Sequence, residues 1–286
     1  MHPELLHVGN YAMHSYTLML GLSFALGIWL SRRRAGTGHL DRGAVFDAGL
    51  LIALVAIPGA RIYYVLLHPD RFGDNLVRVV MGWPDSIGGS GGLVMYGGAV
   101  SGLLVAHIYF RMRRLPFLRY ADVMAPGVAL GVCLTRIGCF LNGCCYGEPY
   151  EGPLSVSFPP SSPAGSFQLT GLSAGLFPSQ LFESGAGLLI LAVVLFAERR
   201  KTFDGFQFYL VCLLYAAARF AVDFTRHYGP GERLGSLSHN QVVCTVVFVV
   251  VGALIVKNLR LLKRRQLPVE VRARDMRPAE PAGTID

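Results

Sequence analysis

Charged side chains are scarce in this sequence of 286 residues. Asp, Glu, Lys and Arg make up 15% of it, whereas an average soluble domain has about 25%. Hydrophobic residues make up 52%, which excludes an intrinsically disordered chain because disorder needs low hydrophobicity. The net charge is +8. A soluble nucleic-acid-binding protein is still not expected, because such a protein carries its basic residues on a largely polar surface.

Several familiar sequence signatures are also missing. No Lys or Ser/Thr follows the glycine run 88–92 at the spacing of a nucleotide-binding loop. The cysteines lack the paired Cys-x-x-Cys spacing and the histidine partners of a zinc site. No basic segment precedes the first apolar stretch, so no cleavable signal peptide is expected. There is no evident internal repeat and no soluble domain.

Long apolar stretches are abundant instead, and they predict a membrane protein. A helix needs about 20 mostly apolar residues to cross a bilayer. We predict an all-α, polytopic membrane helix bundle of about seven transmembrane helices, and one transmembrane domain over 1–258. We expect 142–179 within this domain to be an external loop rich in Gly, Pro and Ser, and 259–286 to follow the domain as a basic cytoplasmic tail that is partly disordered. The predicted spans are 11–30, 44–67, 93–110, 122–141, 180–197, 205–224 and 239–256.

The basic residues predict the orientation of the bundle. Nineteen of the 26 Lys and Arg residues fall in the segments 31–42, 111–119 and 198–201 and in the tail from residue 257. With seven spans, all of these segments lie on one side of the membrane. Cytoplasmic loops carry an excess of Lys and Arg, so we expect the N-terminus outside and the C-terminus in the cytoplasm.

A few charged residues fall inside or just outside the predicted spans. Burying charge in a bilayer is costly, so such residues mark either a functional site or a structural ion pair. Arg61, Arg136 and Arg219 lie within spans, and Asp223 lies four residues after Arg219, on the same helix face. Arg136, Arg219 and the nearby Arg226 are expected to converge near the outer leaflet. Guanidinium groups bind phosphate through paired donors, which suggests a phospholipid ligand.

Glycines surround Tyr96. The run 88–92 precedes it, and Gly97 and Gly98 follow it. Glycine permits close approach of the backbone, so this region either packs tightly against another helix or keeps a helix entry open beside Tyr96. Both interpretations are compatible with the sequence.

Three of the six cysteines crowd into seven residues at the outer end of the fourth span. They are Cys139, Cys144 and Cys145. Free buried thiols are one interpretation, since free cysteine is often simply buried. A disulfide or a redox role is the other, because the outer side of the membrane can be oxidising.

Several motifs occur in an order that resembles the prolipoprotein diacylglyceryl transferase family over about residues 11–256. The run 135–147, Thr-Arg-Ile-Gly-Cys-Phe-Leu-Asn-Gly-Cys-Cys-Tyr-Gly, is similar to the family signature Gly-Arg-x-Gly-Asn-Phe-x-Asn-Gly-Glu-x-x-Gly. The other matching fragments are His14-Ser-Tyr16, Gly59-Ala-Arg61-Ile-Tyr-Tyr64, Asp122-Val-Met-Ala-Pro126, Pro178-Ser-Gln180-Leu-Phe-Glu183, Arg219-Phe-Ala-Val-Asp223-Phe-Thr-Arg226 and Ser238-His-Asn-Gln241.

The resemblance implies a multi-pass enzyme of the bacterial inner membrane. Its activity would be transfer of the diacylglyceryl group of phosphatidylglycerol to the lipobox cysteine of a prolipoprotein, which forms a thioether and releases glycerol 1-phosphate. The implied partners are phosphatidylglycerol, the prolipoprotein signal peptide and membrane lipids, without nucleic acid. The resemblance implies no metal and no other cofactor.

It also implies roles for individual residues. The catalytic residues would be Arg219, Arg136, Tyr96 and His14. The substrate-binding residues would be Tyr16, Arg61, Gly97, Gly98, Asn142, Gln180, Glu183, Asp223 and Arg226, with Glu183 and Asp223 holding the arginines in place.

Four positions depart from the family pattern. Tyr96 stands where the family has a histidine that is a proposed base. A free tyrosine has a pKa near 10 and is a poor base at neutral pH, unless an adjacent arginine lowers the value or His14 substitutes for it. Cys139 and Cys144 replace a signature Asn and Glu, and Asp223 replaces a Glu.

Two other functions remain compatible with the sequence. One is a membrane thiol-redox protein that uses the three clustered cysteines, which would not need arginines near the outer leaflet. The other is a lipid-binding or transport protein on the same bundle. The lack of an obvious inverted repeat argues mildly against a transporter.

Overall fold

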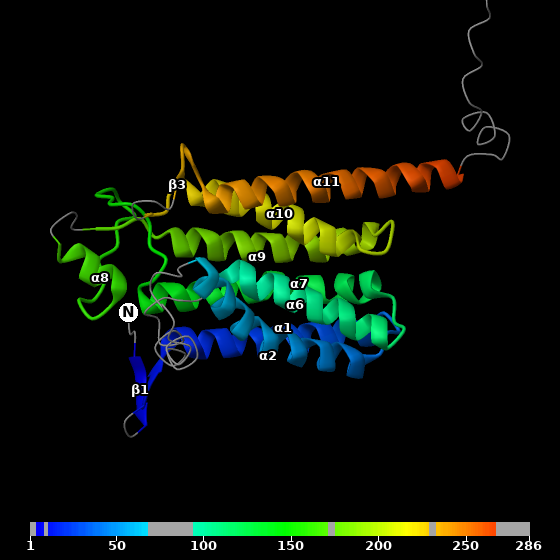
Figure 1. Cartoon of the computed structure of the whole chain (residues 1–286), viewed down its shortest axis with the longest axis horizontal. Helices are drawn as coiled ribbons and strands as arrows, with labels where there is room; N and C mark the ends of the chain where they lie inside the picture. The colour runs from blue at the N-terminus through cyan, green and yellow to red at the C-terminus, as the bar shows by residue number, and fades with distance from the viewer. Residues whose placement is uncertain (1–3, 9–10, 68–93, 171–174, 229–232, 267–286) are drawn as a thin grey trace, which may run out of the picture.

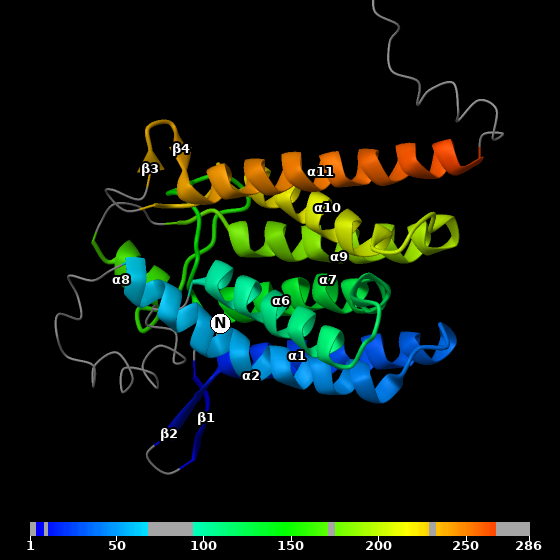
Figure 2. The same ribbon diagram turned by 45° about the vertical axis from the view of Figure 1, so that its right-hand side comes forward.

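The computed structural model describes residues 4–8, 11–67, 94–170, 175–228 and 233–266. Seven long helices run side by side within these residues (Figures 1 and 2). They are α1 (Ser15–Thr37), α2 (Arg42–Leu67), α6 (Met95–Met112), α7 (Phe117–Asn142), α9 (Ser179–Ala197), α10 (Phe206–Asp223) and α11 (His239–Gln266). The smaller elements are strands β1 (Glu4–Val8), β2 (Tyr11–His14), β3 (Arg233–Leu234) and β4 (Leu237–Ser238), helix α8 (Pro163–Gln168) and the 3₁₀ turn η1 (Glu198–Arg200).

Five of the described helices are long and apolar enough to cross a membrane. They are α2, α7, α9 together with η1, α10 and α11. The polytopic membrane helix bundle is therefore confirmed. The remaining long helices, α1 and α6, do not meet this criterion of length and composition, so a total of seven spans stays a prediction.

The two ends of the bundle differ in composition. Hairpins β1–β2 and β3–β4 and helix α8 lie at one end (Figure 2). Helices α1, α6, α9 and α11 run in the same direction, so their C-terminal ends meet at the opposite end (Figure 1). The basic residues cluster at that opposite end, in the last turns of α1 and α6, in η1 and at the end of α11. The orientation prediction expects these basic segments on one side of the membrane, and they lie at one end of the bundle.

The limits of the first and last spans differ from the sequence prediction. The prediction of a helix from Tyr11 was wrong for residues 11–14, because this segment pairs with β1 as an antiparallel hairpin and α1 begins at Ser15. At the other end α11 continues to Gln266, so the first part of the basic tail is a helix extension. The glycine run 88–92 and residues 267–286 lie outside the described residues.

Small residues allow close helix crossings. A Cβ on Gly27 of α1 would lie 3.1 Å from the carbonyl oxygen of Gly127 on α7. A Cβ on Gly97 of α6 would collide with the carbonyl oxygen of Gly59 on α2, and one on Gly98 would lie 2.9 Å from the carbonyl oxygen of Ala56. Small residues at such crossings are a common way to pack helices in membranes. Gly97 and Gly98 therefore have a packing role.

Asp122 shows how one buried acid is compensated. Its carboxylate is 1% exposed and accepts hydrogen bonds from the amides of Gly205, at 2.7 Å, and Phe208, at 3.0 Å. Lys201 Nζ lies 2.9 Å from the same carboxylate. The amides at the beginning of a helix have no partner within it. Asp122 supplies that partner to α10 from α7, so its role is structural.

Candidate active site

A buried carboxylate on α9 joins two arginines from different helices. Glu183 Oε1 lies 2.9 Å from Arg136 Nη2 of α7 and 3.7 Å from Arg219 Nε of α10. The Tyr215 hydroxyl donates a hydrogen bond to the same oxygen at 3.0 Å. Glu183 and both arginines are buried. Two cations thus share one anion at the centre of this cluster.

Asp223 provides a second carboxylate for Arg219 and connects α10 to the beginning of α11. Arg219 Nη1 lies 2.6 Å from Asp223 Oδ1. Asp223 also accepts hydrogen bonds from the hydroxyls of Tyr228 and Ser238. Ser238 is fixed in turn by Gln241, whose Oε1 accepts its backbone amide hydrogen at 3.0 Å. The polar fragments matched at 219–226 and 238–241 therefore form one network.

Several buried donors in this region have no hydrogen-bond partner among the described residues. They are Nε and Nη1 of Arg219, Nε of Arg226 and Nδ2 of Asn142. Arg219 Nη1 is within ion-pair distance of Asp223, but its hydrogens do not point at the carboxylate. An unpaired buried donor costs about 1–3 kcal/mol. A ligand with acceptor oxygens would remove that cost.

Arg226 lies beside the same network. Its guanidinium stacks over the Tyr228 ring at 5.9 Å from the centroid, and the Tyr228 hydroxyl accepts a hydrogen bond from Arg219 Nη2 at 3.4 Å. The backbone of Arg226 pairs with Gly147 in an isolated antiparallel bridge. The structure thus brings the three arginines Arg136, Arg219 and Arg226 to one end of the bundle.

Tyr96 and His14, the two candidate bases, lie on different elements. Tyr96 is in the first turn of α6, and its hydroxyl lies 3.9 Å from Cys244 Sγ of α11. Arg219 is close enough to Tyr96 to interact with it electrostatically. His14 is the last residue of β2, and its buried Nδ1 has no hydrogen-bond partner among the described residues.

The remaining predicted substrate-binding residues are on α1, α2 and α9. Tyr16 packs on α7, where a Cβ on Gly138 would lie 3.5 Å from the Tyr16 Cα. Arg61 is buried on α2, with its guanidinium 5.6 Å from the centroid of the Tyr64 ring. Gln180 is buried at the start of α9 and donates a hydrogen bond from Nε2 to the Cys144 carbonyl oxygen at 2.9 Å. Their roles in binding stay predictions.

The cysteine-containing loop begins where α7 ends. Gly143 ends the helix in the left-handed region, with φ of 71°. Cys145 also has a positive φ, of 60°, which costs a residue with a side chain roughly 1–2 kcal/mol. Hydrogen bonds from the Cys139 and Cys144 thiols lower the pKa of the Cys145 thiol well below its usual value, and Arg226 acts in the same direction. All six cysteines are free thiols.

Sequence reasoning missed two tyrosines of the site. Tyr215 lies four residues before Arg219, and Asp223 lies four residues after it. Helical spacing puts all three residues on one face of α10, so this spacing could have identified Tyr215. Tyr228 follows the end of α10, and no periodic pattern marks it. Its place in the network depends on how the chain turns back toward α11.

Comparisons with known proteins show which family this chain belongs to. The family model described as prolipoprotein diacylglyceryl transferase matches residues 3–257. Several similar proteins are named phosphatidylglycerol–prolipoprotein diacylglyceryl transferase. The one from Bordetella bronchiseptica is 32% identical over 82% of this chain and 86% of its own length. Those from Acaryochloris marina and Clostridium botulinum are 29% and 28% identical, over 92% and 93% of this chain and 92% and 100% of their own lengths. This chain therefore belongs to the prolipoprotein diacylglyceryl transferase family.

Proposed function

We propose that this protein transfers the diacylglyceryl group of phosphatidylglycerol to the lipobox cysteine thiol of prolipoproteins, forming a thioether and releasing glycerol 1-phosphate. Family membership supports the activity and its transferase class. The proposal extends to a protein of the bacterial inner membrane with seven spans, its N-terminus outside and its C-terminus in the cytoplasm. The clustering of basic residues at one end of the bundle supports that orientation.

The observation that carries the proposal is the pair of buried arginines on Glu183. One carboxylate faces two guanidiniums, and Arg219 keeps donors that are not aligned with any acceptor among the described residues. Arg226 adds a further unpartnered donor nearby. An anion with several oxygen acceptors satisfies such donors, and a phosphodiester is one. A bundle that is surrounded by lipid meets this anion as a phospholipid headgroup.

The reaction forms a sulfur–carbon bond and breaks the carbon–oxygen bond to phosphate. The leaving glycerol phosphate takes the electron pair, so negative charge develops on its oxygens. Arg136 and Arg219 are positioned to stabilise that charge, and donors fixed before the reaction do so without reorganisation. Tyr16, Asn142 and Gln180 would hold the headgroup by hydrogen bonds.

The thiol must lose its proton to become the nucleophile. We propose Tyr96 as the acceptor, with His14 as the second candidate. Tyr96 lies in the first turn of α6, close enough to Arg219 to interact with it electrostatically. His14 Nδ1 is buried and has no hydrogen-bond partner among the described residues, and histidine is the side chain that most often acts as a general base.

Complementation of a bacterial strain depleted of its own transferase tests the activity. Mass spectrometry of a model prolipoprotein should show the diacylglyceryl adduct when the protein and phosphatidylglycerol are present. Arg219→Ala should lower the rate by about 100-fold or more, the usual cost of removing a preorganised donor to developing charge. Arg119→Ala is the matched control, because Arg119 pairs with Asp204 on the exposed surface.

Absence of the adduct with the wild-type protein would contradict the proposal, and an unchanged rate in Arg219→Ala would move the site elsewhere. The same assay separates the other two functions that the sequence allowed. A lipid-binding protein would bind phosphatidylglycerol without turnover, and a thiol-redox protein would not depend on Arg219.

A further inference from the structure

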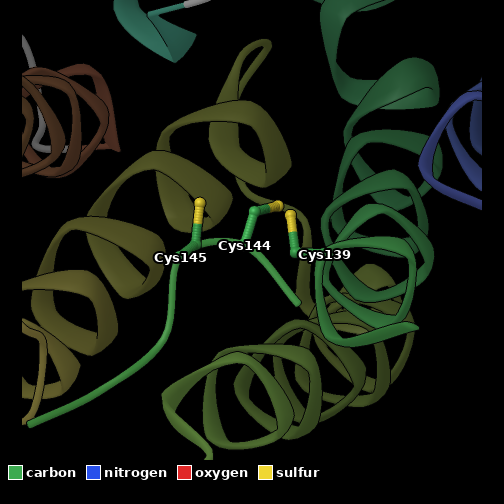
Figure 3. A group of neighbouring side chains, drawn as sticks. All are labelled: Cys139, Cys144 and Cys145. Carbon is green, nitrogen blue, oxygen red and sulfur yellow. The ribbon is translucent and has the colours of Figure 1, made fainter. Parts of the chain in front are cut away.

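Three cysteine side chains meet at the outer end of α7. Cys139 is in the last turn of the helix, and Cys144 and Cys145 follow in the loop (Figure 3). Their Sγ atoms all lie within 4.8 Å of one another. In Figure 3 the Cys139 and Cys144 thiols point toward each other, and the Cys145 thiol projects to the same side of the chain. The three sulfurs form a compact group without any bridge between them.

The size of this group fits a metal ion bound by three sulfurs. Thiolate sulfurs lie about 2.3 Å from a bound zinc ion, which places two sulfurs of one tetrahedral site about 3.8 Å apart. The three sulfurs all lie within 4.8 Å of one another, so no separation exceeds the spacing of such a tetrahedral site by more than about 1 Å. Only small side-chain rotations are therefore needed to bring all three sulfurs to bonding distance from one ion.

The backbone holds the three thiols in this arrangement. Gly143 turns the chain at the end of α7, and a Cβ there would lie 2.7 Å from the Ser162 side chain. Cys145 adopts a positive φ, a conformation that side chains resist and that is retained where the surrounding structure imposes it. Gln180 of α9 donates to the Cys144 carbonyl oxygen. The turn at Gly143, the backbone conformation of Cys145 and the hydrogen bond from Gln180 together orient the loop toward Cys139.

Two arginine side chains lie beside the cysteines. Arg136 Nη1 donates to Cys139 Sγ at 3.8 Å. Arg226 is close enough to Cys145 to interact with it electrostatically. Metal-bound cysteines are thiolates, so a site with three of them carries excess negative charge. Arg136 and Arg226 can balance that charge without themselves coordinating the ion.

We propose that Cys139, Cys144 and Cys145 form a binding site for a soft, thiophilic metal ion, of which Cu(I) fits best. Thiolates select Cu(I) and zinc among the common metals. Within the described residues the group includes no histidine or carboxylate. Zinc needs a fourth ligand, whereas three sulfurs complete the trigonal coordination of Cu(I). The site would tie the loop to α7 beside Arg136 and Arg226, and it goes beyond the transferase activity.

Competition with a chromogenic Cu(I) chelator tests this site. The full-length protein in detergent micelles, reduced and free of oxygen, is titrated into the Cu(I)–bicinchoninate complex. We expect one equivalent of Cu(I) to move to the protein. Cys139→Ser, Cys144→Ser and Cys145→Ser should each weaken binding at least tenfold. Cys212→Ser is the matched control, because Cys212 lies within α10, outside the cluster, and its loss should change nothing.

A second readout keeps the result independent of protein yield and of transfer activity. Cu(I) should raise the melting temperature of the wild-type protein and leave that of the triple serine variant unchanged. Retention of Cu(I) by the triple variant, or no transfer of Cu(I) to the wild type, would overturn the proposal. So would a disulfide between two of these cysteines in membranes that were alkylated before lysis. Prolipoprotein modification is measured separately, so a failure of this site leaves the proposed function untouched.

Discussion

Replacing Glu183 with glutamine removes the one charge that two buried arginines share. The side chain keeps its shape and can still accept a hydrogen bond from Tyr215, which lies 3.0 Å from Oε1. Arg136 loses the carboxylate at 2.9 Å, whereas Arg219 keeps Asp223 at 2.6 Å. The substitution therefore tests mainly the cost of leaving the Arg136 guanidinium buried without its counter-ion.

The expected cost is large because the pair is almost fully buried. The side chains of Arg136 and Glu183 are 10% and 3% exposed. Breaking a buried ion pair by removing one partner costs about 3–5 kcal/mol. At about 2 °C per kcal/mol for a chain of this size, the melting temperature should fall by roughly 6 °C or more.

Glu198→Gln is the matched control for this experiment. Glu198 pairs with Arg34 at 2.8 Å, but its side chain is 49% exposed, and exposed pairs contribute about 0–1 kcal/mol. Thermal unfolding of both variants is measured in the same detergent, together with the rate of prolipoprotein modification. Equal melting temperatures for the two variants would refute the reasoning that the Glu183 cluster is a buried, compensated network.

Three further experiments test other parts of the site and the fold. If Tyr96 accepts the thiol proton, Tyr96→Phe should lower the transfer rate by about 100-fold or more, and His14→Ala should not. A large loss in His14→Ala with a normal rate in Tyr96→Phe assigns the role to His14. Normal rates in both variants exclude both residues as the proton acceptor. Gly143→Ala should lower the free energy of unfolding by about 1–2 kcal/mol or more in chemical denaturation, because its φ of 71° disfavours a side chain. Asp122→Asn should lower the free energy of unfolding by about 1–3 kcal/mol, because the carboxylate charge that faces the α10 amides and Lys201 is lost. Asp204→Asn, on the surface, should lower it by less than about 1 kcal/mol. Similar losses in these two variants would contradict the capping role of Asp122.

The helices could be predicted because a bilayer leaves a strong mark on composition. All seven long helices coincide with apolar stretches that the sequence shows. The hairpin at residues 4–14 could not be predicted in the same way. Tyr11–His14 is as apolar as the start of a span, and only pairing with β1 decides that it is a strand. The continuation of α11 to Gln266 depends on helix propensity rather than on hydropathy.

The site could be predicted in part, for a similar reason. Charges inside apolar stretches stand out, so Arg136, Arg219 and Asp223 were identifiable from position alone. Their sharing of partners was not, because Glu183 and Tyr228 reach them only through the packing of α9 and the turn after α10. The proximity of three thiols likewise depends on the turn at the end of α7 rather than on a recognisable spacing.

The pairing of α1 with α7 has a consequence for the order in which the bundle assembles. α1 packs far more extensively on α7 than on α2, its neighbour in sequence. At about 5–20 residues per second, synthesis of the chain from α1 to the end of α7 takes roughly 5–20 s. Throughout that time the polar face of α1 lacks its final partner. Ser23 and Ser31 donate to carbonyl oxygens of their own helix, at Leu20 and Gly27. These two hydroxyls therefore have acceptors within α1 itself, before α7 has been synthesised.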